Sequence, residues 1–348
     1  LSSYFLDRNL EEGRGEKIAL RVGKDRRSFS ELALRVRRLT AWMRQVGLRP
    51  EERVLLALSD GFEFAETFFA VLRAGGVFAM VNPLQKRESL EYALRYTKAR
   101  ILVADASVLQ ELGDARGASR FLVQVLVVGG ADVSGATRFE EALAAHSPDD
   151  KAAFLEPTGP DDLAGWLFTS GSTGEPKAGV HTHADLAYST ETDALQVAGY
   201  REDDLCLSVP KLFFGYATGT NLMFPFRVGA GVVLFPGRAT AEVLFDLIEE
   251  HKPTFLTGVP TIIGNMLRSE RIDRVDLSSL RVVLSAGEAL PPELYDNWKR
   301  RTGVEILDGI GSAEMFHIYI SNCMGDVRPG SLGKLVPGYE AAIVDDRG

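Results

Sequence analysis

The chain has 348 residues, 45% hydrophobic and 25% charged, which is the composition of a globular protein with one large or two smaller domains. Its formal net charge of −9 argues against nucleic acid as the main partner, and its apolar runs are shorter than the roughly 20 residues that span a bilayer. Its two cysteines, Cys206 and Cys323, have the spacing neither of a zinc site nor of a disulfide framework, so we expect a cytoplasmic protein without a membrane partner. The sequence indicates no oligomeric state.

Short strand-like runs alternate with helical patterns along most of the chain. Apolar residues three or four positions apart predict a helix over 32–46, and further helical patterns occur at 62–75, 88–99, 241–252 and 291–303. Buried strands are expected at 53–60, 77–83, 100–105, 125–130, 204–210, 231–237, 253–260, 280–287 and 304–311. This order predicts an α/β fold: two packed α/β subdomains with mostly parallel sheets covered by helices.

The segment 147–162 is rich in Pro and Asp and is the best candidate for a surface connection between two blocks of this alternation. We expect a first α/β subdomain at 1–160 and a second at 161–325. The chain does not begin with Met, so we also expect that its natural start is missing.

The stretch FTSGSTGEPK, residues 168–177, carries the first chemical signal. Glycines without a Cβ let backbone N–H groups approach a ligand, and the neighbouring hydroxyl groups add donors, so the loop suits a polyphosphate. Lys177 can neutralise part of that charge. The loop is not a Walker A motif, because Ala178 follows the lysine where Ser or Thr is required. The alternative is a plain surface loop.

Two further glycine turns follow predicted strands and carry acids. In ILDGIGSAE, residues 306–314, the turn can lie flat against a planar ring, and Glu314 can hold Mg²⁺. The stretch SAGEAL, residues 285–290, is a similar turn. Each is a weak signal alone, and the alternative for the first is an ordinary strand–helix turn with a solvated Glu314.

Histidines and aromatic residues leave alternatives open. His181 and His183 have the spacing of a metal pair on a strand, but no third ligand follows nearby. His317 is either a satisfied core histidine or part of a pocket wall. The aromatic cluster KLFFGYATG, residues 211–219, is either core or a slot for an aryl group, because Gly215 and Gly219 leave space among the rings.

Taken together, TSGSTGEPK, SAGEAL and DGIGSAE, in this order, resemble the acyl-adenylate-forming superfamily of acyl-CoA synthetases, adenylation domains and luciferases. The resemblance covers nearly the whole chain, and KLFFGYATG, VHTH, GVPT and DGIGSAEMFHIYISN resemble the benzoate-CoA ligase branch, which includes anthranilate-CoA ligases. It implies that a carboxylate attacks the α-phosphorus of ATP to form an acyl-adenylate, and that the thiolate of coenzyme A then displaces AMP.

The resemblance also implies roles for individual residues. The catalytic residues would be Lys177, Glu314 as the Mg²⁺ ligand, and Ser312 at the α-phosphate, where the family usually has Thr. The β- and γ-phosphates would be cradled by Thr169, Ser170, Gly171, Ser172, Thr173 and Gly174, and the adenine by Gly287, Glu288, Ala289, Asp308, Gly309 and Ile310. The acyl pocket would be formed by Phe213, Phe214, Gly215, Tyr216, Gly311, His317 and Ile318.

The chain departs from the family's pattern in two places. Ala178 stands where the family usually has Gly, which would stiffen the exit of the loop. Residues 326–348 would begin a β subdomain that is cut short, before the ribose-binding aspartate and the carboxy-terminal lid domain with its adenylation lysine. We therefore expect this chain to bind ATP and an aryl acid but to be severely impaired in adenylation and thioester formation.

The expected substrate is an aromatic acid. The segment 213–219 has no aspartate to pair with an α-ammonium group, and its aromatic residues imply a short, flat pocket. Benzoate-type sequences tend to carry Ala where this chain has Gly215, so anthranilate is favoured and benzoate is next. The alternatives are an adenylation enzyme that loads a carrier protein and a non-catalytic nucleotide-binding module.

Overall fold

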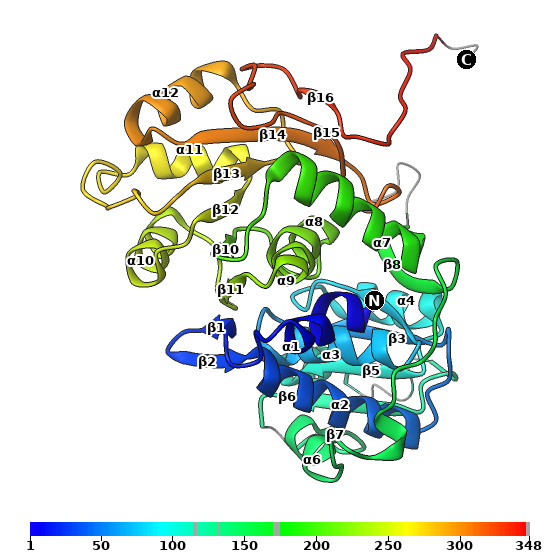
Figure 1. The fold of residues 1–348 in the computed structure, drawn as a ribbon. Helices are drawn as coiled ribbons and strands as arrows, with labels where there is room; N and C mark the ends of the chain where they lie inside the picture. The colour runs from blue at the N-terminus through cyan, green and yellow to red at the C-terminus, as the bar shows by residue number, and fades with distance from the viewer. Residues whose placement is uncertain (114–116, 118, 131, 170–174, 346–348) are drawn as a thin grey trace.

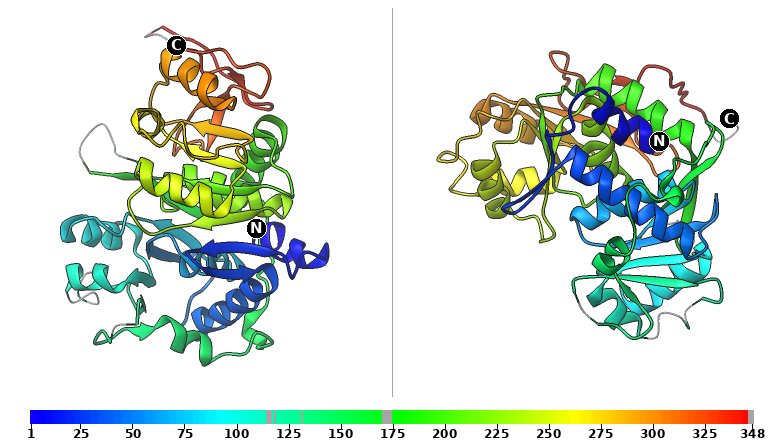
Figure 2. Two further views of the ribbon diagram at one scale, coloured as in Figure 1. Left: turned by 90° about the vertical axis from the view of Figure 1, so that its left-hand side faces the viewer. Right: turned by 60° about the horizontal axis from the view of Figure 1, so that its bottom comes forward.

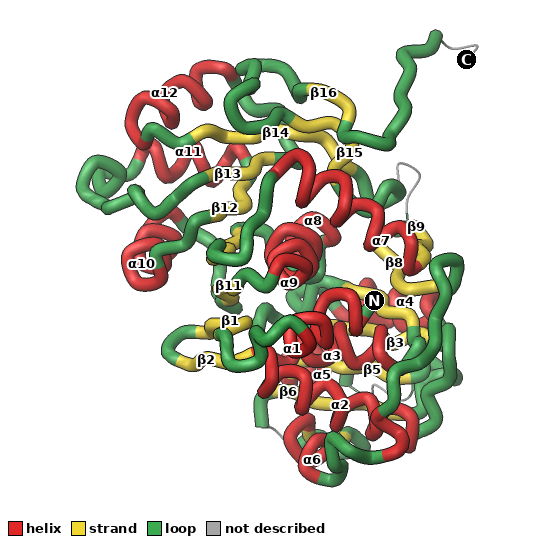
Figure 3. Tube along the Cα trace, in the orientation of Figure 1, coloured by secondary structure: helices red, strands yellow, loops and turns green. Residues whose placement is uncertain are grey.

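The computed structural model describes residues 1–113, 117, 119–130, 132–169 and 175–345. Two helix-covered sheets make up the molecule and stack on each other, as the ribbon and tube views show (Figures 1 and 3). Within the described residues, neighbouring strands pair in parallel except at β1–β2, β8–β9, β14–β15 and β15–β16. The predicted α/β class with mostly parallel sheets is confirmed.

The first sheet has seven strands in the order β7-β6-β5-β3-β4-β8-β9. Alternate residues along its strands pack on helices of opposite faces: α2 and α3 cover one face, and α4 and α5 cover the other. The strands are β3 (Arg53–Ala57), β4 (Val77–Met80), β5 (Ile101–Asp105), β6 (Gln124–Val128), β7 (Thr137–Arg138), β8 (Leu163–Thr169) and β9 (Lys177–Thr182). The helices are α2 (Phe29–Gln45), α3 (Phe62–Arg73), α4 (Arg87–Thr97), α5 (Ala106–Leu112), α6 (Phe139–Ala144) and η2 (Lys151–Ala153).

The second sheet has nine strands in the order β16-β15-β14-β13-β12-β10-β11-β1-β2. Its strands are β1 (Ile18–Val22), β2 (Asp25–Ser28), β10 (Leu205–Ser208), β11 (Gly231–Leu234), β12 (Phe255–Gly258), β13 (Val282–Ser285), β14 (Glu305–Gly311), β15 (Ile318–Ser321) and β16 (Lys334–Leu335). One face packs on α10 (Ala241–His251), α11 (Pro260–Arg268) and α12 (Pro292–Thr302).

The opposite face of the second sheet shares one hydrophobic core with α2 and α3 of the first. The helical segments in this shared layer are η1 (Ser3–Asp7), α1 (Arg8–Glu11), α7 (His183–Ser189), η3 (Thr190–Ala198), α8 (Gly215–Thr218), η4 (Gly219–Met223) and α9 (Phe224–Val228). Of these, η1, η3 and η4 are π-helical. The two sheets are therefore joined by packed side chains as well as by the chain itself. Figure 2 shows the ribbon of both sheets from two further sides.

Sheet membership does not follow the expected division at residue 160. The β8–β9 hairpin, expected in the second subdomain, completes the first sheet, where β8 pairs with β4. The β1–β2 hairpin, expected in the first, completes the second sheet, where β1 pairs with β11. A hairpin does not signal in its own residues which distant strand it will join, because the pairing is long-range. Within 326–345, the described residues form β16, which pairs with β15.

Local signals still set the ends of many elements. Ser28 and Glu31 form a capping box at the start of α2, with Glu31 N donating to Ser28 Oγ at 3.2 Å and Ser28 N to Glu31 Oε2 at 2.8 Å. Gly303 at φ +76° ends α12 in the left-handed conformation that glycine favours. None of the described helices combines the length and the apolar character that crossing a membrane requires.

A buried carboxylate links the β1–β2 hairpin to the helices of the first sheet. Glu66 of α3 is fully buried and pairs with Arg27 of β2 and with Arg35 of α2, whose Nε lies 2.8 Å from Glu66 Oε1. Removing the carboxylate would leave the partly buried Arg27 without its ion-pair partner, whereas Arg35 would keep its pair with Glu140.

We therefore predict that Glu66→Ala lowers the free energy of unfolding by about 3 kcal/mol or more. Chemical denaturation of the two proteins side by side measures the effect. The matched control is Glu16→Ala, which removes an exposed carboxylate and should change stability by less than about 0.5 kcal/mol. A loss for Glu66→Ala as small as that of the control would contradict this account.

Candidate active site

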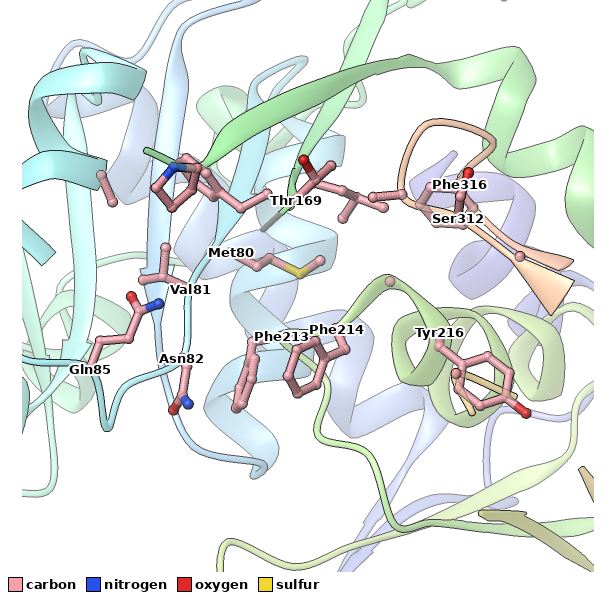
Figure 4. A pocket seen from close by; sticks show the side chains of 18 of the residues that line it. Met80, Val81, Asn82, Gln85, Thr169, Phe213, Phe214, Tyr216, Ser312 and Phe316 are labelled. Carbon is pink, nitrogen blue, oxygen red and sulfur yellow. The ribbon is translucent and has the colours of Figure 1, made fainter. Parts of the chain in front are cut away.

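A cavity of about 770 Å³ lies where residues that follow strands of both sheets come together. Figure 4 shows its side chains converging from the first sheet on one side and from the α8 and β14–β15 segments on the other. Ligands of parallel α/β sheets bind beyond the carboxyl ends of the strands. The lining residues are Met80, Val81, Asn82, Gln85, Glu88, Ser89, Tyr92, Ala93, Leu167, Phe168, Thr169, Glu175, Pro176, Phe213, Phe214, Gly215, Tyr216, Ala286, Gly287, Gly311, Ser312, Ala313, Phe316, His317 and Ile318.

The seven residues predicted for the acyl pocket all line this cavity. Four of them come from the segment after β10 that leads into α8, and three from the β14–β15 hairpin. The rings of Phe213 and Phe214 lie 4.5 Å apart between centroids, and Phe214 is 56% exposed, so it stands at the opening of the cavity. Their role in binding an acid stays a prediction.

Two glycines shape this wall. A Cβ at Gly311 would lie 2.6 Å from the carbonyl oxygen of His317, and backbone cannot move aside cheaply. A Cβ at Gly215 would lie 2.6 Å from Cδ1 of Leu167. The space that the missing methyl group of Gly215 frees is therefore occupied by the end of the Leu167 side chain.

The turn that carries Phe213 and Phe214 is held from the other sheet. Asp60, which follows β3, is buried, and its Oδ1 accepts a hydrogen bond from Leu212 N at 2.8 Å. Burial raises the pKa of the Asp60 carboxyl to about 7, while Lys211 and the Leu212 amide oppose that rise. Lys211 Nζ donates to Phe235 O at 2.6 Å, and burial lowers its pKa to about 8. Asp60 thus joins the first sheet directly to the aromatic wall.

His317 is both a satisfied core histidine and part of the cavity wall. It is 3% exposed, its Nδ1 lies 3.1 Å from Asp193 Oδ2, and its Nε2 lies 3.1 Å from Tyr216 O. Phe224 packs edge-on against the imidazole, with 4.5 Å between centroids. The two interpretations that the sequence left open are therefore compatible.

The residues predicted to surround adenine come from two neighbouring strands. Ser285 at the end of β13 pairs with Asp308 of β14, which continues through Ile310 to Gly311. Gly287 lines the cavity, whereas Glu288, Ala289, Asp308, Gly309 and Ile310 do not appear in its wall. Burial raises the pKa of Asp308 to about 6, opposed by the Ser285 hydroxyl and the Leu290 amide. Glu288 Oε2 accepts hydrogen bonds from Thr261 N at 3.1 Å and Thr261 Oγ1 at 2.7 Å at the start of α11.

The two ends of the predicted phosphate loop lie together. Thr169 lines the cavity and pairs with Lys177 across the β8–β9 hairpin. The intervening predicted residues, Ser170, Gly171, Ser172, Thr173 and Gly174, lie outside the described part of the chain. Tyr92 and Tyr96 of α4 hold the exit of the loop: Tyr92 Oη donates to Pro176 O at 2.8 Å, and Ala178 N donates to Tyr96 Oη at 3.4 Å. Lys177 is exposed between these two anchors.

Ser312 and Glu314 follow β14, and Ser312 lines the cavity. Glu314 is exposed, and its carboxylate makes no hydrogen bond or ion pair with another described residue. No group of three or more potential metal ligands occurs among the residues that the structure describes. A single free carboxylate fits Mg²⁺ that arrives with a phosphate ligand, because that ion commonly takes one or two carboxylates and completes its shell with phosphate and water.

The alternative metal pair, His181 and His183, does not form one site. His181 Nε2 lies 2.6 Å from Ala313 O, which ties β9 to the β14–β15 turn. His183 begins α7 instead of continuing the strand, and burial lowers its pKa to about 4.

The wall formed by α4 and the residues after β4 was missed by the sequence analysis. Met80, Asn82 and Gln85 line the cavity beside the two phenylalanines (Figure 4). The signal was available in the stretch VNP, a predicted strand end followed by a turn, because both sheets present such ends to one ligand site. Asp60 and Asp193 were also missed, and their partners are distant in sequence.

Residues 6–348 match the family described as AMP-binding enzyme, and the chain belongs to this family. Among its relatives, the benzoate–CoA ligase of Thauera aromatica is 40% identical over 345 residues, 99% of this chain and 64% of that protein. The chain thus spans less than two thirds of the length of this relative.

Two solved structures share the fold over 100% of this chain. The anthranilate CoA ligase AuaEII in complex with anthranoyl-AMP has a TM-score of 0.95 and 36% identity, with 66% of its chain covered. A benzoate CoA ligase from Burkholderia xenovorans LB400 has a TM-score of 0.90 and 37% identity, with 68% of its chain covered.

The buried Asp60 carboxyl makes stability depend on pH in a defined direction. Its folded-state pKa of about 7 lies above the unfolded value of 3.8, so the folded protein holds this proton more tightly. The contribution favours folding at low pH and is lost as pH rises from about 4 to above 7. Asparagine keeps the acceptor for Leu212 N but does not titrate.

We therefore predict that Asp60→Asn becomes more stable relative to the wild type, by about 2–3 kcal/mol, between pH 5 and pH 7.5. Denaturant unfolding of both proteins at the two pH values measures this change. An unchanged stability difference would show that Asp60 does not titrate in this range in the folded protein.

Proposed function

We propose that this chain forms the ATP- and acid-binding part of an aryl-CoA ligase that converts an aromatic carboxylate to its adenylate and then to its CoA thioester. The observation that carries the proposal is the aromatic cavity, whose wall runs from Phe213 and Phe214 to Thr169 at the entrance of the predicted phosphate loop. A carboxylate bound among the rings would point toward the α-phosphate of ATP. The family and the named activities of the relatives support this assignment.

The first step requires an oxygen of the carboxylate to meet the α-phosphorus in line with the departing pyrophosphate. The protein's contribution to such a reaction is positioning and the neutralisation of charge. The aromatic wall would orient the ring, Ser312 would donate to the α-phosphate, and Lys177 would offset the charge of the β- and γ-phosphates. Bound Mg²⁺, held by Glu314, would supply further neutralisation of the phosphate oxygens.

The exact acid depends on the volume next to Gly215. Anthranilate was favoured because the missing methyl group would admit a ring substituent, but Leu167 fills that volume. The contact involves the flexible end of a leucine side chain, which can rotate away at low cost, so an ortho-amino group remains compatible with the pocket. We therefore propose anthranilate and benzoate as the two candidate acids, with Leu167 and Gly215 together selecting between them.

Titration calorimetry of this chain with anthranilate, benzoate and the hydroxybenzoates, in the presence of ATP and Mg²⁺, tests this assignment. We expect anthranilate to bind more tightly than benzoate, and Gly215→Ala to weaken anthranilate about tenfold more than benzoate. Leu167→Ala in the Gly215→Ala background should restore part of the loss. Equal weakening of both acids would indicate that the added methyl group contacts Leu167 and not the ring substituent. It would remove the argument for anthranilate. Absence of binding by every aryl acid would contradict the proposed function.

The phosphate-binding roles can be separated by two substitutions. We expect Lys177→Met to weaken ATP binding at least tenfold while AMP binding changes little, because the lysine faces the β- and γ-phosphates in this proposal. Glu314→Gln should abolish most of the enhancement of ATP binding by Mg²⁺. Lys334→Met, which removes an exposed lysine paired with Asp326, is the matched control. Equal losses for ATP and AMP with Lys177→Met would contradict the assignment of Lys177.

The acceptor of the activated acid is part of the same proposal. We propose coenzyme A, in keeping with the named activities of the relatives. A thioester assay on the protein that contains this chain, supplied in turn with coenzyme A and with a pantetheine-bearing carrier protein, decides between them.

A further inference from the structure

His317 makes more contacts with neighbouring elements than a residue that only lines a cavity needs. Its imidazole is enclosed by Asp193 of η3, the carbonyl of Tyr216 in α8, Gly219 of η4 and the ring of Phe224 in α9. A Cβ at Gly219 would lie 2.5 Å from Cδ2 of His317, so the glycine allows the backbone of η4 to lie against the ring. The imidazole therefore has a single position defined by four elements.

Both ring nitrogens face hydrogen-bond acceptors. The carbonyl of Tyr216 can only accept, so Nε2 must carry a proton, and an ionised Asp193 carboxylate can also only accept, so Nδ1 must carry one as well. With Asp193 ionised, satisfying both partners requires the doubly protonated imidazolium, paired with the Asp193 carboxylate. This pair is almost completely buried, with 0% and 7% exposure of the two side chains.

No other charge explains this state among the residues described around the ring. The phenol of Tyr216 lies beside the imidazole with 5.5 Å between centroids, and burial raises its pKa well above the usual value, so it is neutral. Tyr200 and Tyr339 interact with Asp193 electrostatically, and burial raises their pKa values too. Phe224 and Phe316 bring no charge. Asp193 is therefore the counter-ion of the ring.

The helix that carries Asp193 is unusual. The segment η3 is π-helical over nine residues, and π-helical turns are rare and are frequently found at functional sites. The carboxylate of Asp193 points from this helix to a residue 124 positions away in the sequence. A core position could be filled by an apolar side chain at no electrostatic cost, so a buried acid there needs a reason.

We propose that Asp193 is a positioning residue of the acyl pocket, which holds His317 as an imidazolium so that the ring joins the two walls of the pocket. Nε2–H of His317, from the β14–β15 hairpin, donates to Tyr216 O, from the segment that carries Phe213 and Gly215. The chain Asp193–His317–Tyr216 thus sets the distance between the walls. The consequence for substrate binding rests on the proposed aryl-acid function, whereas the charge state of His317 does not.

The charge state can be measured without any ligand. Long-range ¹H–¹⁵N correlation spectra of the chain, labelled in its five histidines, report directly whether each ring nitrogen carries a proton. At pH 7 we expect both nitrogens of His317, assigned by comparison with His317→Gln, to be protonated in the wild type. In Asp193→Asn, which has the same size but no charge, we expect one protonated nitrogen. A singly protonated His317 in the wild type would overturn the proposal.

The positioning role is measured by titration of the aryl acid and of AMP. We expect Asp193→Leu, which fills a similar volume without an acceptor, to weaken aryl-acid binding at least tenfold and to leave AMP binding within twofold. Asp193→Asn can still hydrogen-bond a neutral His317 and should stay within about threefold of the wild type for the acid. Thr192→Val, at the preceding position of η3, removes a hydroxyl that donates to Tyr188 O at 2.8 Å and should leave both affinities unchanged.

The outcomes separate this inference from the proposed function. Unchanged acid affinity in a folded Asp193→Leu would overturn the positioning role, as would an equal loss of acid and AMP binding. If Asp193→Leu does not fold, Asp193→Ala, which also removes the acceptor, replaces it in the same titrations with the same expected and contradicting results. If the wild type binds no aryl acid but shows a doubly protonated His317, the proposed function fails while the assigned charge state stands.

Discussion

The shared hydrophobic core between the two sheets is the constraint on which the site depends. Side chains from α2 and α3, which cover the first sheet, pack in one continuous cluster with those from η3, η4 and α9, which cover the second. Burial of this apolar surface fixes how the sheets face each other. Because strand ends of both sheets then open onto one space, a cavity forms whose walls no single sheet could supply.

Buried carboxylates add directional hydrogen bonds and ion pairs to this apolar packing. Glu66 links β2 to α2 and α3, Asp60 links β3 to the turn before Phe213, and Asp193 links η3 to His317. In each case the partner belongs to an element that is distant in sequence, so the acid specifies which elements meet. Such groups cost desolvation energy and are poor sources of stability, but each supplies a directional contact that apolar packing does not provide. Two of them, Asp60 and Asp193, bond to residues in or next to the wall of the cavity.

The sequence predicted individual strands and helices well, but it did not predict which distant strands pair. The strands that end in Gly, Pro or Asp and the helices between them occur where periodicity placed them, because each pattern reflects burial of a single element. The exchange of the β1–β2 and β8–β9 hairpins between sheets was not predictable, since an edge strand pairs according to the shape of the finished core. Residues marked by glycine motifs, such as Gly287 and Gly311, line the cavity as expected of pocket residues, and their roles stay predictions. Asp60 and Asp193 lie in ordinary sequence and were not identified from it.

Under the proposed function, the selectivity of the pocket would follow from the same contacts between distant segments. A residue-by-residue comparison suggests that Gly215 leaves the volume of a methyl group free. In the folded protein, the end of the Leu167 side chain of β8 occupies that volume. The volume available to a substituted ring is therefore set jointly by the first sheet, which supplies Leu167, and by the second, which supplies Gly215 and His317. A substitution on either side changes the room for the ligand only as far as the other side permits. For this reason, the acid selected under the proposed function would depend on both sheets and on the contacts that join them, and no single pocket residue would determine it.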